Sequence, residues 1–299
     1  MNYLEDIIIK IAVENPVHGK KLKKNIGKQT QEYKNKANEF FGTYIDFAKK
    51  SDKDLDYGVA CYLRMLADVN QEYIAFLETG EYTTKSFEDA NRRVYNNPEV
   101  MEYYMHGLLM SQYLWVHHND IYKFFVGNII AYKNDVKRYL EIGAGHGMYI
   151  SEATKLLSSD TVYDVVDISP TSLEISKSFI AKKDINYMLT DIYEYEPSEK
   201  YDFITMGEVL EHVEDPISLL KCVASLLKDD GTLFITAPAN APAIDHIYLF
   251  KNAQDIRDVI TKAGLKVEIE HAEYVEDVSP EIAEQFKIAL MYGAFLKKQ

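Results

Sequence analysis

The chain has little cysteine and no long hydrophobic run. Among its 299 residues only Cys61 and Cys222 are cysteines, and both stand in apolar, helix-like stretches. We interpret them as reduced core residues. No apolar run approaches the roughly 20 residues that a membrane-spanning helix needs, and the N-terminal segment lacks the basic and apolar regions of a secretory signal. These absences predict a cytoplasmic protein with no membrane partner.

Basic residues are scarce as well. The chain carries 33 Lys and Arg against 47 Asp and Glu, a net charge of -14. Nucleic-acid binding depends on clustered Lys and Arg that neutralise phosphates. The densest basic run, residues 20–24, is interpreted as the solvated face of a helix or loop. We therefore expect no nucleic-acid partner.

Apolar residues and tyrosine are plentiful. Apolar residues make up 47% of the chain, and its length allows two domains with sizeable cores. The 23 tyrosines suit either a pocket for a semi-polar ligand or an ordinary helical core, and composition does not decide between the two.

The first 130 residues show the spacing of helices. Apolar side chains recur at helical intervals from residue 33 to 48 and from 59 to 76. Asn97 followed by Pro98 is a typical helix start, and Asn119 with Asp120 predicts the start of the next helix. We expect residues 1–130 to form a helical domain that covers an acceptor site. The paired His117 and His118 receive no definite role.

From residue 131 to 299 the pattern changes to short apolar runs that alternate with helical stretches. Alternation of this kind predicts an α/β domain with a mostly parallel sheet covered on both faces. A helix is expected from Pro216, after the N-cap Asp215, to Lys228, with Asp230 and Gly231 as its stop. The expected strands span residues 136–142, 162–168, 185–189, 201–206, 232–236 and 265–269.

Ligands of open parallel sheets bind at the carboxyl ends of the strands. The first strand ends in the glycine loop of residues 143–147, where the backbone can turn tightly and approach a ligand. Met148 stands where the dinucleotide fingerprint needs glycine, which disfavours a nicotinamide cofactor. Asp167 follows the second strand, at about the 20-residue offset of a ribose-binding acid. Asp191 follows the third strand and is a candidate acceptor for an adenine amino group. Taken singly, each acid has a structural alternative, Asp167 as a helix cap and Asp191 as a surface acid.

Four motifs occur in order at strand ends: E-I-G-A-G-H-G at 141–147, V-V-D-I-S at 165–169, T-D-I at 190–192 and E-V-L-E-H-V-E-D-P at 208–216. Together they resemble the class I S-adenosylmethionine (SAM)-dependent methyltransferases, and most closely the small-molecule group that includes ubiquinone-biosynthesis O-methyltransferases. The resemblance covers about residues 135–270. It implies a Rossmann-like, doubly wound, seven-stranded sheet after an N-terminal helical domain. It also implies SAM as cofactor and a small-molecule methyl acceptor.

The resemblance also assigns cofactor contacts. The glycine loop would hold the methionine part of SAM, the acids after the second and third strands would hold ribose and adenine, and backbone near Met206 and Gly207 would meet the ammonium group. His146 departs from the family pattern and is interpreted as a bystander. The residues assigned to SAM are Glu141, Gly143, Ala144, Gly145, Asp167, Ile168, Asp191, Ile192 and Gly207.

A helical turn over residues 208–213 would place Glu208, Glu211 and His212 on one side. In one hypothesis Glu211 or His212 is a general base, with His246 nearby. In another, all four bind a divalent cation (Mg, Mn, Fe or Zn) that polarises an acceptor hydroxyl, as the resemblance to metal-using relatives with E-x-x-E-H implies. In a third, the motif only packs below the pocket.

Three other functions stay open at this point. SAM can react at a carbon other than its methyl group, for example by cyclisation. RNA methylation would fit the E-x-x-E-H motif but not the net charge. A non-catalytic SAM-binding protein would carry the same cofactor motifs.

Overall fold

The computed structural model describes residues 2–181 and 184–299. Its centre is a seven-stranded sheet in the order β3-β2-β1-β4-β5-β7-β6, in which only β7 runs antiparallel to its neighbours. This confirms the predicted mostly parallel sheet. The strands are β1 (Arg138–Ile142), β2 (Val162–Asp167), β3 (Ile185–Leu189), β4 (Tyr201–Gly207), β5 (Leu227–Ala239), β6 (Leu265–Tyr274) and β7 (Leu290–Lys298).

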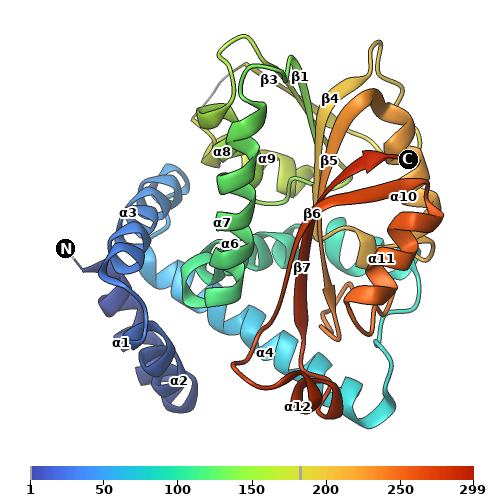
Figure 1. Ribbon diagram of the computed structural model, residues 1–299. Coiled ribbons are helices and arrows are strands. Elements are labelled where there is room, and N and C mark those ends of the chain that lie inside the picture. The colour runs from blue at the N-terminus through green and yellow to red at the C-terminus, as the bar shows by residue number, and fades with distance from the viewer. Residues whose placement is uncertain (1, 182–183) are drawn as a thin grey trace.

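Helices precede the sheet and cover both of its faces. Figure 1 shows α7, α8 and α9 on one side of the strands and α10 and α11 on the other. The helices are α1 (Tyr3–Glu14), α2 (Pro16–Gly27), α3 (Gln31–Ala48), α4 (Leu55–Thr79), α5 (Phe87–Ala90), α6 (Pro98–Leu114), α7 (Val116–Ile129), α8 (Met148–Leu156), α9 (Pro170–Phe179), α10 (Pro216–Leu226), α11 (Ala253–Lys262) and α12 (Pro280–Gln285). No helix in these described ranges is both long enough and apolar enough to cross a bilayer.

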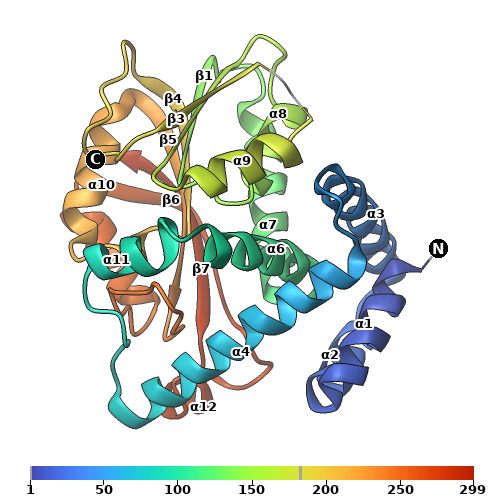
Figure 2. The ribbon, with the colours of Figure 1, turned by 180° about the vertical axis from the view of Figure 1, so that it is seen from behind.

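Three apolar cores hold these layers together. One packs α10 and α11 on the sheet, and a second packs α7, α8 and α9 on its other face around Phe203, Phe234 and Phe295. The third lies among α1 to α6 and contains the fully buried Phe41 and Tyr62. Figure 2, seen from behind, shows α4 and α6 crossing in front of the sheet, beside α7. The predicted N-terminal helical region is therefore present and packs directly against the sheet domain.

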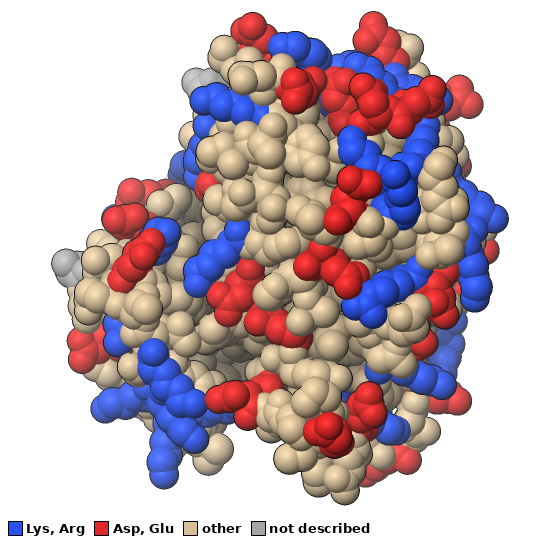
Figure 3. All heavy atoms as spheres, in the orientation of Figure 1, with Lys and Arg blue, Asp and Glu red and all other residues tan. Residues whose placement is uncertain are grey.

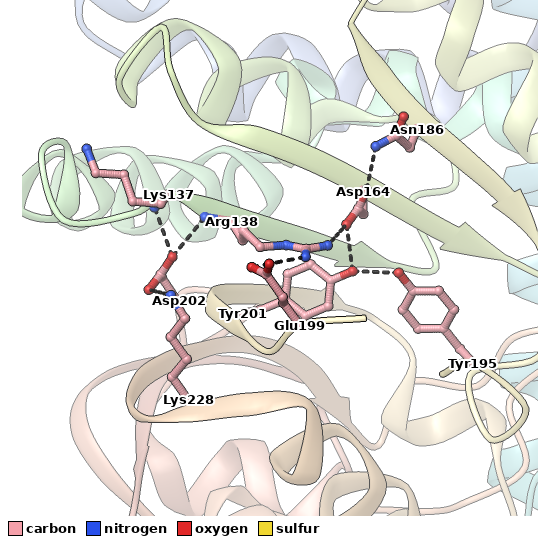
Figure 4. A network of polar contacts seen from close by, with 9 residues as sticks. All are labelled: Lys137, Arg138, Asp164, Asn186, Tyr195, Glu199, Tyr201, Asp202 and Lys228. Atoms are coloured by element: carbon pink, nitrogen blue, oxygen red, sulfur yellow. Dashed lines mark hydrogen bonds and ion pairs between the residues drawn. The ribbon is translucent and has the colours of Figure 1, made fainter. Parts of the chain in front are cut away.

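A polar network at Asp164 fixes the register of the central strands (Figure 4). The Asp164 carboxylate accepts hydrogen bonds from Arg138 on β1 at 2.9 Å, Asn186 on β3 at 2.8 Å and Tyr201 on β4 at 2.6 Å. Burying a carboxylate is costly unless it is paired in this way. Asp164 thus ties β2 to three other strands near their amino ends, opposite the ends that carry the motifs.

Two predicted helix ends were wrong. Helix α7 begins at Val116, with Trp115 in extended conformation before it, so Asn119 lies inside the helix rather than at its cap. Helix α10 ends at Leu226, because β5 already begins at Leu227 and runs past Asp230 and Gly231. The pairing of β4 with β5 shifts register at this point, which accommodates the early start of the strand.

Candidate active site

A cavity of about 800 Å³ lies at the carboxyl ends of the central strands. Its walls come from the ends of β1, β2 and β4 on one side and from α2, α4, α6 and the start of α7 on the other. Ligand pockets of proteins commonly have volumes of roughly 300–1,000 Å³. The cavity is thus large enough for a cofactor and a second molecule, and the helical region supplies part of its wall.

The glycine loop after β1 turns as its sequence predicts. Gly143, Gly145 and Gly147 have φ values of 65°, 52° and 80°, in the left-handed region that side chains disfavour. A Cβ atom on Gly143 would lie 2.8 Å from Cγ2 of Val209. Residues 143–146 of the loop, Ala144 among them, line the cavity.

Asp167 lies at the end of β2, beside the glycine loop. Its carboxylate accepts the Gly145 N–H at 3.2 Å and the Ser169 N–H at 2.8 Å. Burial raises the pKa of Asp167 to about 6, against the opposing effect of these hydrogen bonds. Ser169, not Asp167, caps α9. Asp167 and Ile168 therefore reach the cavity wall without serving as the helix cap.

Glu141 is buried below the glycine loop, with an exposed fraction of 2%. The Tyr139 hydroxyl donates to its Oε2 at 2.8 Å. Burial raises the pKa of Glu141 to about 8, and the charge of Asp167 adds to that rise. Without a bound cation, Glu141 is therefore mostly protonated at pH 7.

Asp191 and Ile192, the two residues predicted to hold adenine, do not belong to the cavity wall. Asp191 turns back on its own loop and accepts the Tyr193 N–H at 2.9 Å. Ile192 is buried in the core that β4 shares with α10. Their contact with adenine therefore stays a prediction.

After β4 and β5 the structure brings Glu211, His212 and His246 together. One ligand atom from each lies within 4.8 Å of the others. Nε2 of His212 is 3.6 Å and Nε2 of His246 is 3.9 Å from Oε1 of Glu211. The Nδ1 atoms approach backbone carbonyls instead, that of Asp245 at 3.1 Å and that of Ala241 at 2.6 Å. Because carbonyls only accept, Nδ1–H donates to them, and the neutral form of each ring faces Glu211 with its acceptor nitrogen Nε2.

The carboxylates of this cluster lack partners. Both oxygens of Glu211, Oε1 of Glu208 and Oδ1 of Asp245 are buried with no hydrogen-bond partner among residues 2–181 and 184–299. Burial, with the charges of Glu208 and Asp245, raises the pKa of Glu211 well above its ordinary value. Burial also raises the pKa of Glu208 to about 7 and lowers that of His246 to about 4. Buried carboxylates without partners are costly, so this cluster favours a cation or added protons.

Glu208 stands apart from the other three. It precedes the short helical turn Leu210–His212, and its φ of 52° is left-handed. Its N–H donates to the Thr236 carbonyl at 3.1 Å. The predicted turn over 208–213 is therefore shorter than expected, and Glu208 lies outside the group of three candidate ligands.

Sequence reasoning did not place Tyr95 or Tyr104 beside this cluster. The rings of Tyr95 and His212 have centroids 6.0 Å apart. Burial, followed by the charge of Asp245, raises the pKa values of Tyr95 and Tyr104 well above the ordinary value. Both line the cavity from the helical region. The abundance of tyrosine was the signal, but it did not indicate which tyrosines lie at the site.

This strand order, with a glycine loop and an acid at adjacent strand ends, is typical of class I SAM-dependent methyltransferase domains. The family described as "Methyltransferase domain" matches residues 117–274, just over half of the chain. The chain therefore belongs to this family.

Curated relatives are similar over part of the chain. Ubiquinone biosynthesis O-methyltransferase of Xanthomonas campestris pv. campestris is 31% identical over 110 residues, which cover 36% of this chain and 45% of that protein. The enzyme of the same name from Coxiella burnetii is 30% identical over 129 residues, covering 42% and 53%. The chain spans about half the length of the curated relatives it matches.

Solved structures share the fold at low identity. The mitomycin 7-O-methyltransferase MmcR superimposes with a TM-score of 0.54 at 13% identity, covering 78% of this chain and 68% of that one. The N-methyltransferase NodS of Bradyrhizobium japonicum, solved with S-adenosylhomocysteine, gives a TM-score of 0.53 at 15% identity, covering 72% and 99%. These similarities confirm the fold that the strand-end motifs predict.

Proposed function

We propose that the protein transfers the methyl group of SAM to a small-molecule acceptor. Family membership supports the cofactor, and the observation that carries the acceptor class is the cavity of about 800 Å³ at the strand ends. Its walls combine the glycine loop with side chains of α4 and α6. Relatives named for ubiquinone biosynthesis, mitomycin 7-O-methylation and N-methylation point the same way.

The residues at the strand ends have distinct parts in this proposal. Asp167 accepts hydrogen bonds from the ribose hydroxyls, with Ile168 beside the adenine. Asp191 and Ile192 approach the adenine after their loop rearranges, because Asp191 now bonds its own backbone. Glu141 and the loop of Gly143, Ala144 and Gly145 hold the methionine part, and backbone at Gly207 meets the ammonium group. The cationic cofactor favours ionised Glu141 and so draws its pKa down.

Methyl transfer from a sulfonium is an in-line displacement, so the protein mainly has to place the acceptor and exclude water. The helical region covers the cavity and serves both needs. A deprotonated acceptor oxygen or nitrogen attacks the methyl carbon, the carbon–sulfur bond breaks, and S-adenosylhomocysteine leaves. A protonated acceptor must first lose its proton to a base.

The cluster at Glu211 has the chemistry of a divalent-cation site. It offers a buried carboxylate without hydrogen bonds and two Nε2 atoms whose rings are oriented through Nδ1, as metal-ligating histidines usually are. We propose Glu211, His212 and His246 as ligands, with Glu208 near them. A bound cation would supply Lewis acidity to an acceptor oxygen. In its absence, Glu211 or His212 is the candidate base.

Incubating the protein with a metabolite extract and methyl-labelled SAM tests the function. We expect the label on a small molecule and stoichiometric S-adenosylhomocysteine, both lost with Asp167→Ala. Methylthioadenosine as the product would instead indicate chemistry at another SAM carbon. Tight SAM binding without turnover on any fraction would indicate a non-catalytic SAM-binding protein.

A further inference from the structure

Three histidines meet where the helical region faces the glycine loop. His117 and His118 lie in the first turn of α7, with ring centroids 4.9 Å apart, and His146 lies in the glycine loop. All three line the cavity, although His146 was expected to be a bystander. Trp115 packs beside the pair, with its ring centroid 4.9 Å from that of His118. The site thus has polar rings on a rigid helix and on the cofactor loop.

Hydrogen bonds within the protein fix which ring nitrogen carries the proton in His118 and His146. The Ser111 hydroxyl donates its only proton to the Leu108 carbonyl at 2.8 Å, so it accepts from His118 Nδ1 at 2.9 Å. His118 therefore carries its proton on Nδ1 and leaves Nε2 bare. His146 Nδ1 accepts the Met148 N–H at 3.3 Å, so its proton is on Nε2. Nε2–H of His146 is therefore a donor, and Nε2 of His118 becomes a donor when that ring is protonated.

The start of α7 adds to this arrangement. Trp115 occupies the N-cap position, and its side chain makes no capping hydrogen bond. The N–H groups of the first turn therefore lack the usual side-chain acceptor, and they lie at the positive end of the helix dipole. The ring of His117, in that turn, makes no hydrogen bond within residues 2–181 and 184–299, and it lines the cavity.

Within residues 2–181 and 184–299, none of these rings is hydrogen-bonded to an acid. Burial lowers the pKa values of His117 and His146 to about 4 and holds that of His118 well below its ordinary value. The charge of Lys21 on α2 also lowers the pKa of His117, and the other two rings lower that of His118. Asp167 and Glu276 line the same cavity but already have partners: Asp167 accepts two backbone N–H groups, and Glu276 pairs with Lys21. The cluster is neutral by itself, and a bound anion would raise its pKa values by supplying the missing counter-charge.

We propose that His117, His118 and His146, with the first turn of α7, form a carboxylate-binding subsite of the cavity. Its occupant is the carboxylate of SAM or a carboxylate on the methyl acceptor, and in both cases the inference rests on the proposed function. Binding draws a proton from solvent onto His118 Nε2, which then donates to the carboxylate beside His146 Nε2–H.

The test uses calorimetry with SAM and with decarboxylated SAM, which lacks only the carboxylate. The double variant His118→Asn/His146→Asn keeps an amide near each Nδ1 position but removes both Nε2 atoms. At pH 7 we expect it to bind SAM about tenfold more weakly or worse, and decarboxylated SAM within about twofold of the wild type, since only the former loses hydrogen bonds to a charged group. Measured in buffers of different ionisation enthalpy, SAM binding by the wild type should take up about one proton more than SAM binding by the double variant, because the proton that Glu141 releases is common to both proteins. His271→Asn, outside the cavity wall, is the matched control.

A second experiment tests whether the subsite binds a carboxylate of the methyl acceptor. If the double variant binds SAM normally, benzoate is titrated into protein saturated with S-adenosylhomocysteine. Binding with proton uptake by the wild type alone supports the subsite, with the acceptor as the source. Equal binding by wild type and variant in both arms, or no benzoate binding once the SAM arm is negative, overturns it. Failure of the wild type to bind SAM at all would count against the proposed function, and the benzoate arm, run without cofactor, would still judge the subsite.

Discussion

Lys21 on α2 and Glu276 after β6 form an ion pair across 255 positions of sequence, with Nζ and Oε1 2.5 Å apart. Both residues line the cavity, and Lys28 approaches Asp277 at 3.7 Å beside them. Figure 3 shows basic side chains gathered at the lower left, where Figure 1 places α2, next to a hollow in the surface. The pair therefore joins the N-terminal helices to the sheet edge at the rim of the cavity.

Breaking this pair should change the kinetics of SAM binding more than protein stability. The side chains of Lys21 and Glu276 are 53% and 39% exposed, and exposed pairs contribute at most about 1 kcal/mol. We expect Lys21→Ala to speed SAM association and dissociation severalfold and to reduce their salt dependence, with little change in Kd. Trp115, the only tryptophan, lines the cavity and can report both rates by stopped-flow fluorescence. Lys10→Ala, which breaks the exposed Lys10–Asp56 pair on α1 and α4, is the control, and identical rates in all three proteins would refute the rim effect.

In the His118→Asn/His146→Asn variant, which takes up no proton at His118, SAM affinity should fall as the pH is lowered through about 6. The folded pKa of Asp167 is raised to about 6, so below that pH the carboxyl is protonated and its two acceptor oxygens become one acceptor and one donor. Affinity should drop by up to tenfold per pH unit, measured by calorimetry between pH 5 and 8. Adding Asp167→Asn should weaken binding throughout and remove this step. An affinity with the same pH dependence with and without Asp167→Asn would contradict the ribose assignment.

Stability should fall as the pH rises towards 8. Burial raises the pKa of Glu141 from 4.5, its ordinary value in an unfolded chain, to about 8, so the folded state binds the proton more tightly. The stabilisation is complete below about pH 4.5 and is lost as the pH rises to about 8. Asp167 and Glu208 also have raised pKa values and keep part of this dependence. We therefore expect Glu141→Gln, which still accepts from Tyr139, to reduce the dependence and to be more stable than wild type at pH 9, by an amount on the order of a few kcal/mol. Urea unfolding across pH checks it, with the exposed Glu78→Gln as control.

Substitution of Gly58 on α4 should destabilise the protein, because α4 packs closely against α3 at this position. A Cβ on Gly58 would collide with the ring and hydroxyl of Tyr44, which is fully buried and bonded to His106. Overpacking of this kind costs about 1–3 kcal/mol, so Gly58→Ala should lower the Tm. Gly127→Ala on α7 meets nothing within 4 Å and should raise stability by about 0.5–1 kcal/mol. Equal thermal shifts for the two variants would refute the packing argument.

The candidate site residues at the strand ends could be predicted, because each stands directly after an apolar run in the sequence. The glycine loop, Asp167 and the Glu211 turn each follow a strand whose apolar run is visible in the sequence, and parallel topology then brings them to one edge. The approach of His246 to Glu211 follows from the same rule, since β5 lies next to β4.

Long-range packing and side-chain rotation were not predictable. The start of α7 depends on an extended Trp115 without a side-chain cap, so the sequence put the helix start at Asn119 and left His117 and His118 without a place. Asp191 satisfies a nearby N–H, a choice of rotamer that no spacing encodes. The facing of Tyr95 towards His212 depends on how α4 to α6 pack on the sheet.

Metal content separates the two hypotheses for the Glu211 cluster. If it holds a divalent cation, protein purified without chelator should contain about one equivalent of metal, and Glu211→Gln or His246→Ala should lose it. Adding Mn²⁺ at about one hundred times Kd to stripped wild type should stabilise it by about 2.7 kcal/mol, with Glu78→Gln behaving as wild type. Glu208→Gln should weaken binding less than Glu211→Gln, because Glu208 lies outside the ligand group. In stripped protein, Glu211→Gln should itself be stabilising, since it removes a buried carboxylate without partners. No bound metal, and no stabilisation by Mg²⁺, Mn²⁺, Fe²⁺ or Zn²⁺, would exclude the cation and leave Glu211 or His212 as the base.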